Sequence, residues 1–120
     1  MKIFLSALCL LWVAAGTNLT TSEAAKHVGE NATVCGAVVG VHTAASSKGS
    51  PTFVNLDKAY PNQVFTVLIW GSDKAKFNPA PASWNGRNAC ATGRIELYRN
   101  VPEIVAHDAG QISFPSEELP

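Results

Sequence analysis

Two strand-like segments near opposite ends of the chain each carry one cysteine and an interior glycine. They read TVCGAVVGV (residues 33–41) and NACATGRIELY (residues 88–98). Glycine inside a strand is typical of a sharp bend or a bulge, as at the corner of a small barrel. Two bent strands so far apart in the sequence indicate a barrel that closes by pairing an early strand with a late one.

The N-terminal segment predicts export. Lys2 gives a basic start, residues 3–15 are almost continuously apolar, and small residues end at Gly16. This pattern is typical of a secretory signal peptide over residues 1–16, with an apolar run too short to span a bilayer. We expect one OB-type domain over residues 17–114 and a solvated tail over residues 115–120, and no membrane association once the signal is removed.

Removal of the signal peptide, which contains Cys9, leaves Cys35 and Cys90. An even number of cysteines in an exported protein favours a disulfide, with two buried free thiols as the alternative. Side chains alternate along a strand, so Cys35 points away from the face of Val34, and Cys90 shares the outward parity of Tyr98. If the two strands are antiparallel neighbours, the sulfurs lie within bonding range.

The remaining pattern predicts an all-β fold of five strands. Thr20 and Glu23 have the spacing of a capping box, which predicts a short N-terminal helix. Strand patterns follow over 32–42, 52–56, 63–70, 88–98 and 103–107, with a helical turn over 72–77 and an extended stretch over 111–114. Three strands, a connector and two more strands favour a five-stranded OB-fold barrel. An SH3-like barrel is the nearest competitor, and the long connector after the third strand argues against it.

Several segments also resemble a known class of domain. They are SEAAKHVGENATVCGAVVGV (22–41), PTFVNL (51–56), FTVLIWG (65–71) and ATGRIELYRNVPEIV (91–105). Together they resemble the small OB-fold domains of the nucleic-acid-binding type, above all the stand-alone exported bacterial ones. The resemblance implies an OB-fold and binding of single-stranded DNA or RNA. The chain departs from that pattern at Ala37 and Val39, where such domains often carry lysine.

Candidate contacts follow from strand parity and charge. On the third strand Phe65, Val67 and Ile69 share one face and are expected to enter the core. Trp70 has the other parity and is the best candidate for base stacking, with a role in capping the barrel as the alternative. Tyr98 is expected to be exposed and Phe53 to be buried in the core. The predicted nucleic-acid contacts are Lys48, Trp70, Lys74, Lys76, Arg87, Arg94, Tyr98 and Arg99.

The charge of the chain gives weaker guidance about function. Nine basic and nine acidic side chains balance overall, but residues 48–99 hold seven basic and three acidic ones. A locally basic middle can contact phosphates, although each base alone is equally compatible with a solubilising role. His27, His42 and His107 are scattered and the cysteines lack CxxC spacing, so we expect no metal and no cofactor.

The leading hypothesis is an exported, non-catalytic module that binds single-stranded nucleic acid with modest affinity. The alternative is a periplasmic or secreted module for a protein, a peptide or a small ligand, or with a structural role. The near-neutral charge and the missing first-strand lysines favour that alternative. A small nuclease is the third possibility, and it would need clustered carboxylates that Asp57, Asp73 and Glu96 do not form in the sequence.

Overall fold

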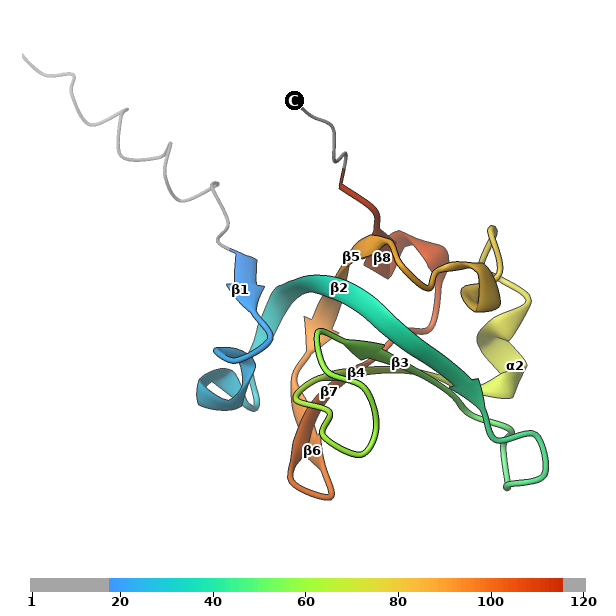
Figure 1. Ribbon diagram of the computed structural model, residues 1–120, viewed down its shortest axis with the longest axis horizontal. Coiled ribbons are helices and arrows are strands. Elements are labelled where there is room, and N and C mark those ends of the chain that lie inside the picture. The colour runs from blue at the N-terminus through green and yellow to red at the C-terminus, as the bar shows by residue number, and fades with distance from the viewer. Residues whose placement is uncertain (1–17, 116–120) are drawn as a thin grey trace, which may run out of the picture.

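The computed structural model describes residues 18–115, which form a β-sheet with short helical turns (Figure 1). Eight strands lie within that range. They are β1 (Asn18–Thr20), β2 (Asn31–Thr43), β3 (Thr52–Leu56), β4 (Thr66–Ile69), β5 (Asn88–Arg94), β6 (Glu96–Tyr98), β7 (Val101–Val105) and β8 (Ile112–Ser113). The helical segments are η1 (Ala24–His27), α2 (Gly71–Lys74), η2 (Pro81–Ser83) and η3 (Ala109–Gln111). The all-β prediction is confirmed, whereas the predicted signal peptide lies outside the described residues.

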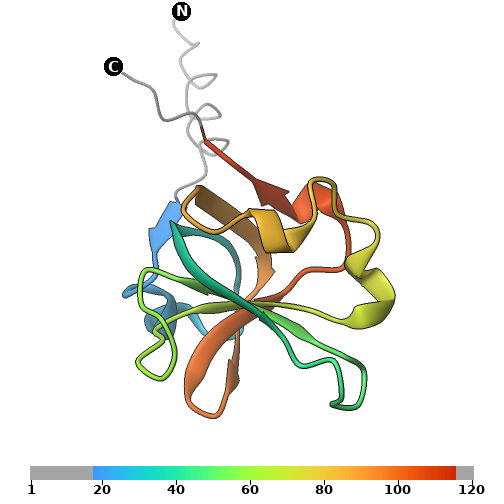
Figure 2. The same ribbon diagram turned by 45° about the vertical axis from the view of Figure 1, so that its right-hand side comes forward.

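The strands follow the order β6–β7–β4–β3–β2–β5–β8, and β1 pairs in parallel with β2. β2 is 13 residues long. Its first part, residues 31–37, pairs with β5, and its second part, residues 38–43, pairs with β3. One long strand therefore belongs to both halves of the sheet, and the sheet curls around it (Figure 2).

The prediction of a closed five-stranded barrel is wrong in two respects, because eight strands are present in residues 18–115 and their order does not return to its start. The predicted strand over 88–98 is interrupted at Ile95, whose amide donates to Glu30 in the register of the β2–β5 ladder but whose carbonyl accepts from Gly29, one residue out of register. Between β5 and β7 the Gln111 side chain donates to the carbonyls of Thr92 (3.0 Å) and Val105 (3.1 Å). A side-chain amide thus stands where a closed barrel would have backbone hydrogen bonds.

Strand parity predicts most of the core correctly. Phe65, Val67 and Ile69 are buried, and Val34 and Val38 of β2 join them. Phe53 is the exception, because it is half-buried and lies outside this cluster. Val54 takes the inward position of β3, opposite Val67, so its neighbour in the chain must point to the other side of the sheet.

Gly36 and Gly93 allow other residues to approach the strands closely, and Gly40, the second glycine of the first segment, lies at an irregularity of β2. A Cβ atom on Gly36 would lie 2.9 Å from the Asp57 carboxyl, and one on Gly93 would lie 2.8 Å from the side chain of Ile104. The register irregularity of β2 falls between Val38 and Gly40. Asp57 uses the space beside Gly36 to accept hydrogen bonds from the Ala37 amide and from the Thr21 hydroxyl.

The N-terminal part is partly as predicted. Thr20 and Glu23 form the reciprocal bonds of a capping box, with the Thr20 amide donating to Glu23 (2.8 Å) and the Glu23 amide donating to the Thr20 hydroxyl (3.3 Å). The helix that follows is a short 3₁₀ segment, η1. β1 was not predicted, since residues 18–20 form a strand by pairing with an edge of β2 and not through a strong strand pattern of their own.

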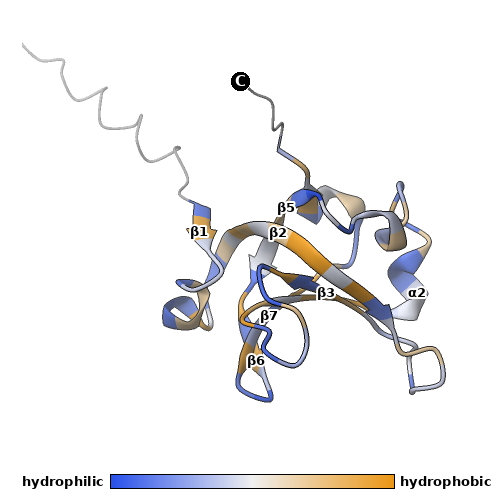
Figure 3. Ribbon diagram, viewed as in Figure 1, coloured by the Kyte–Doolittle hydropathy of each residue, from blue (hydrophilic) through white to orange (hydrophobic). Residues whose placement is uncertain are grey.

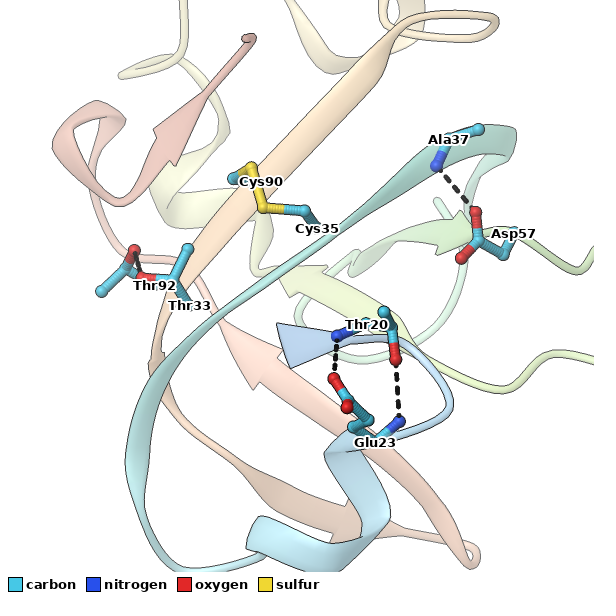
Figure 4. The surroundings of a disulfide bond; sticks show 8 residues. All are labelled: Thr20, Glu23, Thr33, Cys35, Ala37, Asp57, Cys90 and Thr92. Carbon is cyan, nitrogen blue, oxygen red and sulfur yellow. Dashed lines mark hydrogen bonds between the residues drawn. A yellow bond between two sulfur atoms is a disulfide. The ribbon is translucent and has the colours of Figure 1, made fainter. Parts of the chain in front are cut away.

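The predicted disulfide is present. Cys35 and Cys90 are direct partners in the β2–β5 ladder, and their sulfurs are 2.03 Å apart (Figure 4). The same register brings Thr33 opposite Thr92, and the two hydroxyls are 2.7 Å apart. The alternative of two free thiols is therefore wrong. Within residues 18–115, the structure has no helix of the length and apolarity that would cross a membrane.

Candidate functional site

A groove of about 830 Å³ opens on the outer face of β3, β4 and β7. The loop between β3 and β4 and the β6–β7 hairpin lie side by side at one end of the molecule, and both contribute to it (Figures 1 and 2). The outward residues of β3 and β4 form its floor, because their neighbours in the chain fill the core. The groove therefore follows directly from the alternation that buries Val54 and Val67.

The floor is a row of polar residues across three strands. Asn55 is opposite Thr66 in the β3–β4 ladder, and Thr66 is opposite Glu103 in the β4–β7 ladder. All three are buried, and the Thr66 hydroxyl donates to the Asn55 side-chain oxygen (3.0 Å). Gly40 of β2 closes one end of the row and Glu96 of β6 the other.

Glu103 is the unusual member of this row. Its side chain lines the groove but is only 7% exposed, and no hydrogen bond to its carboxyl is found among the described residues. Burial raises the pKa of Glu103 to about 7, and the negative charge of Glu96 adds to the effect. A carboxyl with this pKa can be charged or neutral near physiological pH, so it can accept two hydrogen bonds or donate one.

A second buried acceptor belongs to the β3–β4 loop. Gln63 lines the groove, and its side-chain oxygen is buried without a hydrogen-bond partner in the described part of the chain. Such unpaired buried groups are rare in folded proteins because each one loses the free energy of hydration. The groove thus contains two acceptors, on Gln63 and Glu103, that a ligand with N–H or O–H groups would satisfy.

Aromatic residues form the sides of the groove. Phe53 lies two residues from Asn55 on the same face of β3 and is opposite His42 of β2. Tyr60, from the β3–β4 loop, is 77% exposed, and Tyr98, at the end of β6, is 49% exposed. Three aromatic rings around a polar floor are suited to a flat ligand that stacks and also forms hydrogen bonds.

Arg99 is held at the rim by the shape of the β6–β7 hairpin. Arg99 and Asn100 form its two-residue turn, and both have positive φ (52° and 68°), as a type I′ turn requires. The Arg99 guanidinium lies 5.1 Å from the centre of the Tyr98 ring. The tip of this hairpin is hydrophilic (Figure 3), and its cation stands next to an exposed aromatic ring.

Of the eight predicted contacts, the structure brings Tyr98 and Arg99 into the groove. A second set lies near the β2–β3 loop, at the far end of β3 and β4. Trp70 packs beside Gly49 of that loop and is 39% exposed, and the Lys74 ammonium donates to the Thr43 hydroxyl (3.1 Å). Lys48 is exposed in the same loop.

The other three predicted contacts lie elsewhere, and two of them have local partners. Lys76 pairs with Asp73 (2.8 Å), and that bond, together with one from His107, holds the pKa of Asp73 below its usual value. The Arg87 guanidinium lies 3.9 Å from the centre of the Phe114 ring. Arg94 is exposed at the end of β5, beside the turn at Gly29. None of the three lines the groove.

Sequence reasoning missed five groove residues that the fold makes prominent: Phe53, Asn55, Tyr60, Gln63 and Glu103. Strand alternation alone could have placed Phe53 and Asn55 on the outer face, because an inward Val54 requires its two neighbours to point outward. Glu103 could also have been noticed, because it is the single acid in the strand VPEIV (101–105). No sequence pattern could have indicated Gln63 and Tyr60, since their loop positions depend on tertiary packing.

Comparison with solved structures gives matches to the whole fold. An aspartyl-tRNA synthetase from Entamoeba histolytica matches all of this chain over 25% of its own length, with a TM-score of 0.53 and 16% identity. A Leishmania major protein assigned as an aspartyl-tRNA synthetase matches 88% of this chain over 22% of its own length, with a TM-score of 0.54 and 11% identity. The chain therefore spans about a quarter of each of these proteins.

A third match has the size of this chain. A lipoprotein from Klebsiella pneumoniae to which nucleic-acid binding is ascribed matches 96% of this chain over 100% of its own, with a TM-score of 0.51 and 11% identity. No protein-family model and no curated protein matches the sequence. At identities this low, the likeness shows a shared fold.

Proposed function

We propose that this protein is an exported, non-catalytic OB-type module that binds single-stranded nucleic acid in the groove over β3 and β4. The observation that carries the proposal is the position of the groove. In chain order β3 and β4 correspond to the second and third strands of an OB-fold, and the β6–β7 hairpin corresponds to its last loop. OB-folds bind oligonucleotides on that face, flanked by this last loop and by the loop between their first two strands, which is the β2–β3 loop here.

The contents of the groove support the same function. Phe53, Tyr60 and Tyr98 offer rings on which bases can stack, and Arg99 offers a cation for a phosphate. Trp70 follows β4 with the parity of Thr66 and Leu68, so it continues the groove face toward the β2–β3 loop. A strand of nucleic acid that crosses the face lengthwise would meet Lys48 and Lys74 there, about 10 Å beyond the polar row.

Export is the second part of the proposal. It is supported by the signal-like residues 1–16 and by the Cys35–Cys90 disulfide, since disulfides persist mainly in oxidising compartments. The Klebsiella protein of similar fold is described as a lipoprotein, which is compatible with this part of the proposal. An N-terminal sequence of the protein recovered from its host would test the cleavage after Gly16.

Fluorescence anisotropy with labelled oligonucleotides at low and moderate salt tests the binding. We expect saturable binding that weakens as salt rises, because phosphate contacts release counterions. Arg99→Gln should weaken binding and reduce the salt slope by about one unit. Arg94→Gln is the matched control, since it removes the same charge from a strand that does not line the groove. Absence of binding at low salt would refute the proposal.

The polar floor favours a second candidate, a groove for a neutral small ligand or a peptide. Glu96 and Glu103 place acidic groups below the site, and a carboxylate there repels phosphate. On this alternative the labelled oligonucleotides do not bind, and a neutral ligand or peptide does so without dependence on salt. The absence of catalysis is tested by incubating DNA and RNA with the protein and Mg²⁺, where intact substrate is expected.

A further inference from the structure

The unpaired acceptors of the groove indicate which chemical groups a ligand must bring. The Glu103 side chain is only 7% exposed and forms no hydrogen bond with another residue of 18–115, and the Gln63 side-chain oxygen is fully buried without a partner in that range. Both line one groove. A ligand that fills the groove without donating hydrogen bonds would exclude water from both acceptors and give them no new partner, which would lower its affinity. A ligand with several adjacent N–H groups would satisfy them.

The nucleobases differ in this respect. Guanine presents two adjacent donor groups, N1–H and the N2 amino group, on its Watson–Crick edge, and a carboxylate can accept both. Adenine and cytosine present one amino group beside an acceptor, and thymine presents one N–H between two carbonyls. Guanine also carries the O6 and N7 acceptors, for which arginine is the commonest partner. The groove has an arginine at its rim, Arg99, beside the exposed ring of Tyr98.

We propose that this groove selects guanine, with the Glu103 carboxylate accepting from N1–H and the N2 amino group, Gln63 accepting a further donor, and Arg99 donating to O6 or N7. The base would stack on the aromatic sides of the groove. This inference rests on the proposed function, since it names the base that the single-strand site prefers.

The charged and titratable neighbours of Glu103 set the pH dependence. They are Glu96 on β6, His42 on β2, Tyr60 in the β3–β4 loop, and Tyr98 and Arg99 in the hairpin, while β4 offers the neutral Thr66. The pKa of Glu103 is raised to about 7, so guanine must bind to the form that dominates above this pH. Affinity for guanine therefore falls as the pH drops below 7, by up to about tenfold for each pH unit.

The test uses oligo-dT nonamers with a single central dG, dA, dC or dT, titrated by anisotropy in low salt at several pH values. One guanine in a dT background avoids the self-association of guanine-rich strands. We expect the dG strand to bind about tenfold more tightly than the dT strand at pH 8. This preference should disappear by pH 6, while binding of the dT strand stays constant or strengthens.

Two variants separate base selection from simple charge. Glu103→Gln keeps the size of the side chain but replaces one acceptor with a donor, so it should remove the guanine preference and its pH dependence. Glu96→Gln removes one negative charge from β6, directly across the ladder from Glu103, and Glu96 does not line the groove. It should keep the preference and move its midpoint to lower pH, because Glu103 loses a repulsive neighbour. The wild-type pH profile tests the proposal even if Glu103→Gln does not fold.

The outcomes distinguish this inference from the proposed function. Salt-dependent binding of all four strands with equal affinity overturns guanine selection and leaves single-strand binding intact. No binding of any strand at low salt removes both. Displacement of the labelled strand by a neutral oligosaccharide such as chitohexaose, with no difference among the four strands, makes the groove a sugar site and overturns the inference. A dG preference that survives in Glu103→Gln also overturns it.

Discussion

The two outer faces of this sheet differ in whether their outward polar side chains have bonding partners on the neighbouring strand. Where β2 pairs with β5, two outward pairs bond across the strands, since Thr33 meets Thr92 and Cys35 bonds to Cys90. Where β3, β4 and β7 pair, the outward row includes Glu103, which is buried without a hydrogen bond to another described residue. The first face, which we call the disulfide face, is held by these two bonded pairs, whereas the groove face has a buried carboxyl without such a pair.

This difference separates stability from binding. A buried polar group without a partner lowers stability, so its retention needs an explanation such as a ligand or a proton. Pairs such as Thr33–Thr92 need none, because they hold two strands together. Substitutions on the disulfide face should therefore change stability, and substitutions on the groove face should change affinity or pH dependence.

The largest effect is expected on the disulfide face. Replacement of Cys35 and Cys90 by alanine should lower the free energy of unfolding by about 4 kcal/mol, since the bridge closes a loop of 55 residues. Urea unfolding of the double variant and of the wild type, the latter with and without reductant, measures it. The unfolded, signal-free protein should show no free thiol. An equal stability of reduced and oxidised wild type would contradict the comparison.

The second effect concerns the groove face and depends on pH. Well below pH 4.5 the Glu103 carboxyl is protonated in the folded and unfolded states and contributes nothing to the pH dependence. As the pH rises toward 7, the unfolded state ionises while the folded state holds its proton, because the folded pKa is raised from 4.5 to about 7. The protein should therefore lose up to about 3 kcal/mol of stability across this window.

Glu103→Gln tests that prediction directly. The variant has no carboxyl to titrate, so it should become more stable than the wild type as the pH rises from 4.5 to 7. Urea unfolding at pH 4, 6 and 8 measures the difference between the two proteins, which cancels the titration of other groups. A constant difference over this range would show that the folded pKa of Glu103 is not raised.

The two faces also differ in how well the sequence predicts them. The disulfide face depends on strand alternation and an even cysteine number, and both are local patterns that give Cys35 and Cys90 directly. The groove face depends on which segments meet. Tyr98 and Arg99 were predicted, but Gln63 enters through a loop, and Glu103 lies opposite Thr66 because of a parallel pairing between distant strands. Likewise, the open seam at Gln111 arises from a side chain that no strand pattern indicates.

A smaller effect is expected from an exposed ring of the groove face. Tyr98→Ala should weaken binding of a single-stranded oligonucleotide by about tenfold, since one stacked base is worth roughly 1–3 kcal/mol. The free energy of unfolding of this variant should differ from that of the wild type by less than about 0.5 kcal/mol, because the Tyr98 ring is half exposed. Anisotropy and urea unfolding of the same preparation measure both. A stability loss without a loss of affinity would reverse the roles given to the two faces.

The smallest effect returns to the disulfide face. Thr92→Val keeps the shape of the side chain and removes the hydroxyl that lies 2.7 Å from Thr33. We expect a stability loss of about 1 kcal/mol, the usual value of one such hydrogen bond, and no change in affinity for an oligonucleotide. The double variant with Thr33→Val should be no less stable than either single variant, because the second substitution removes an already unpaired hydroxyl. Strictly additive losses would show that the two threonines act separately, and that the satisfied pairs of this face contribute less to its cohesion than its disulfide does.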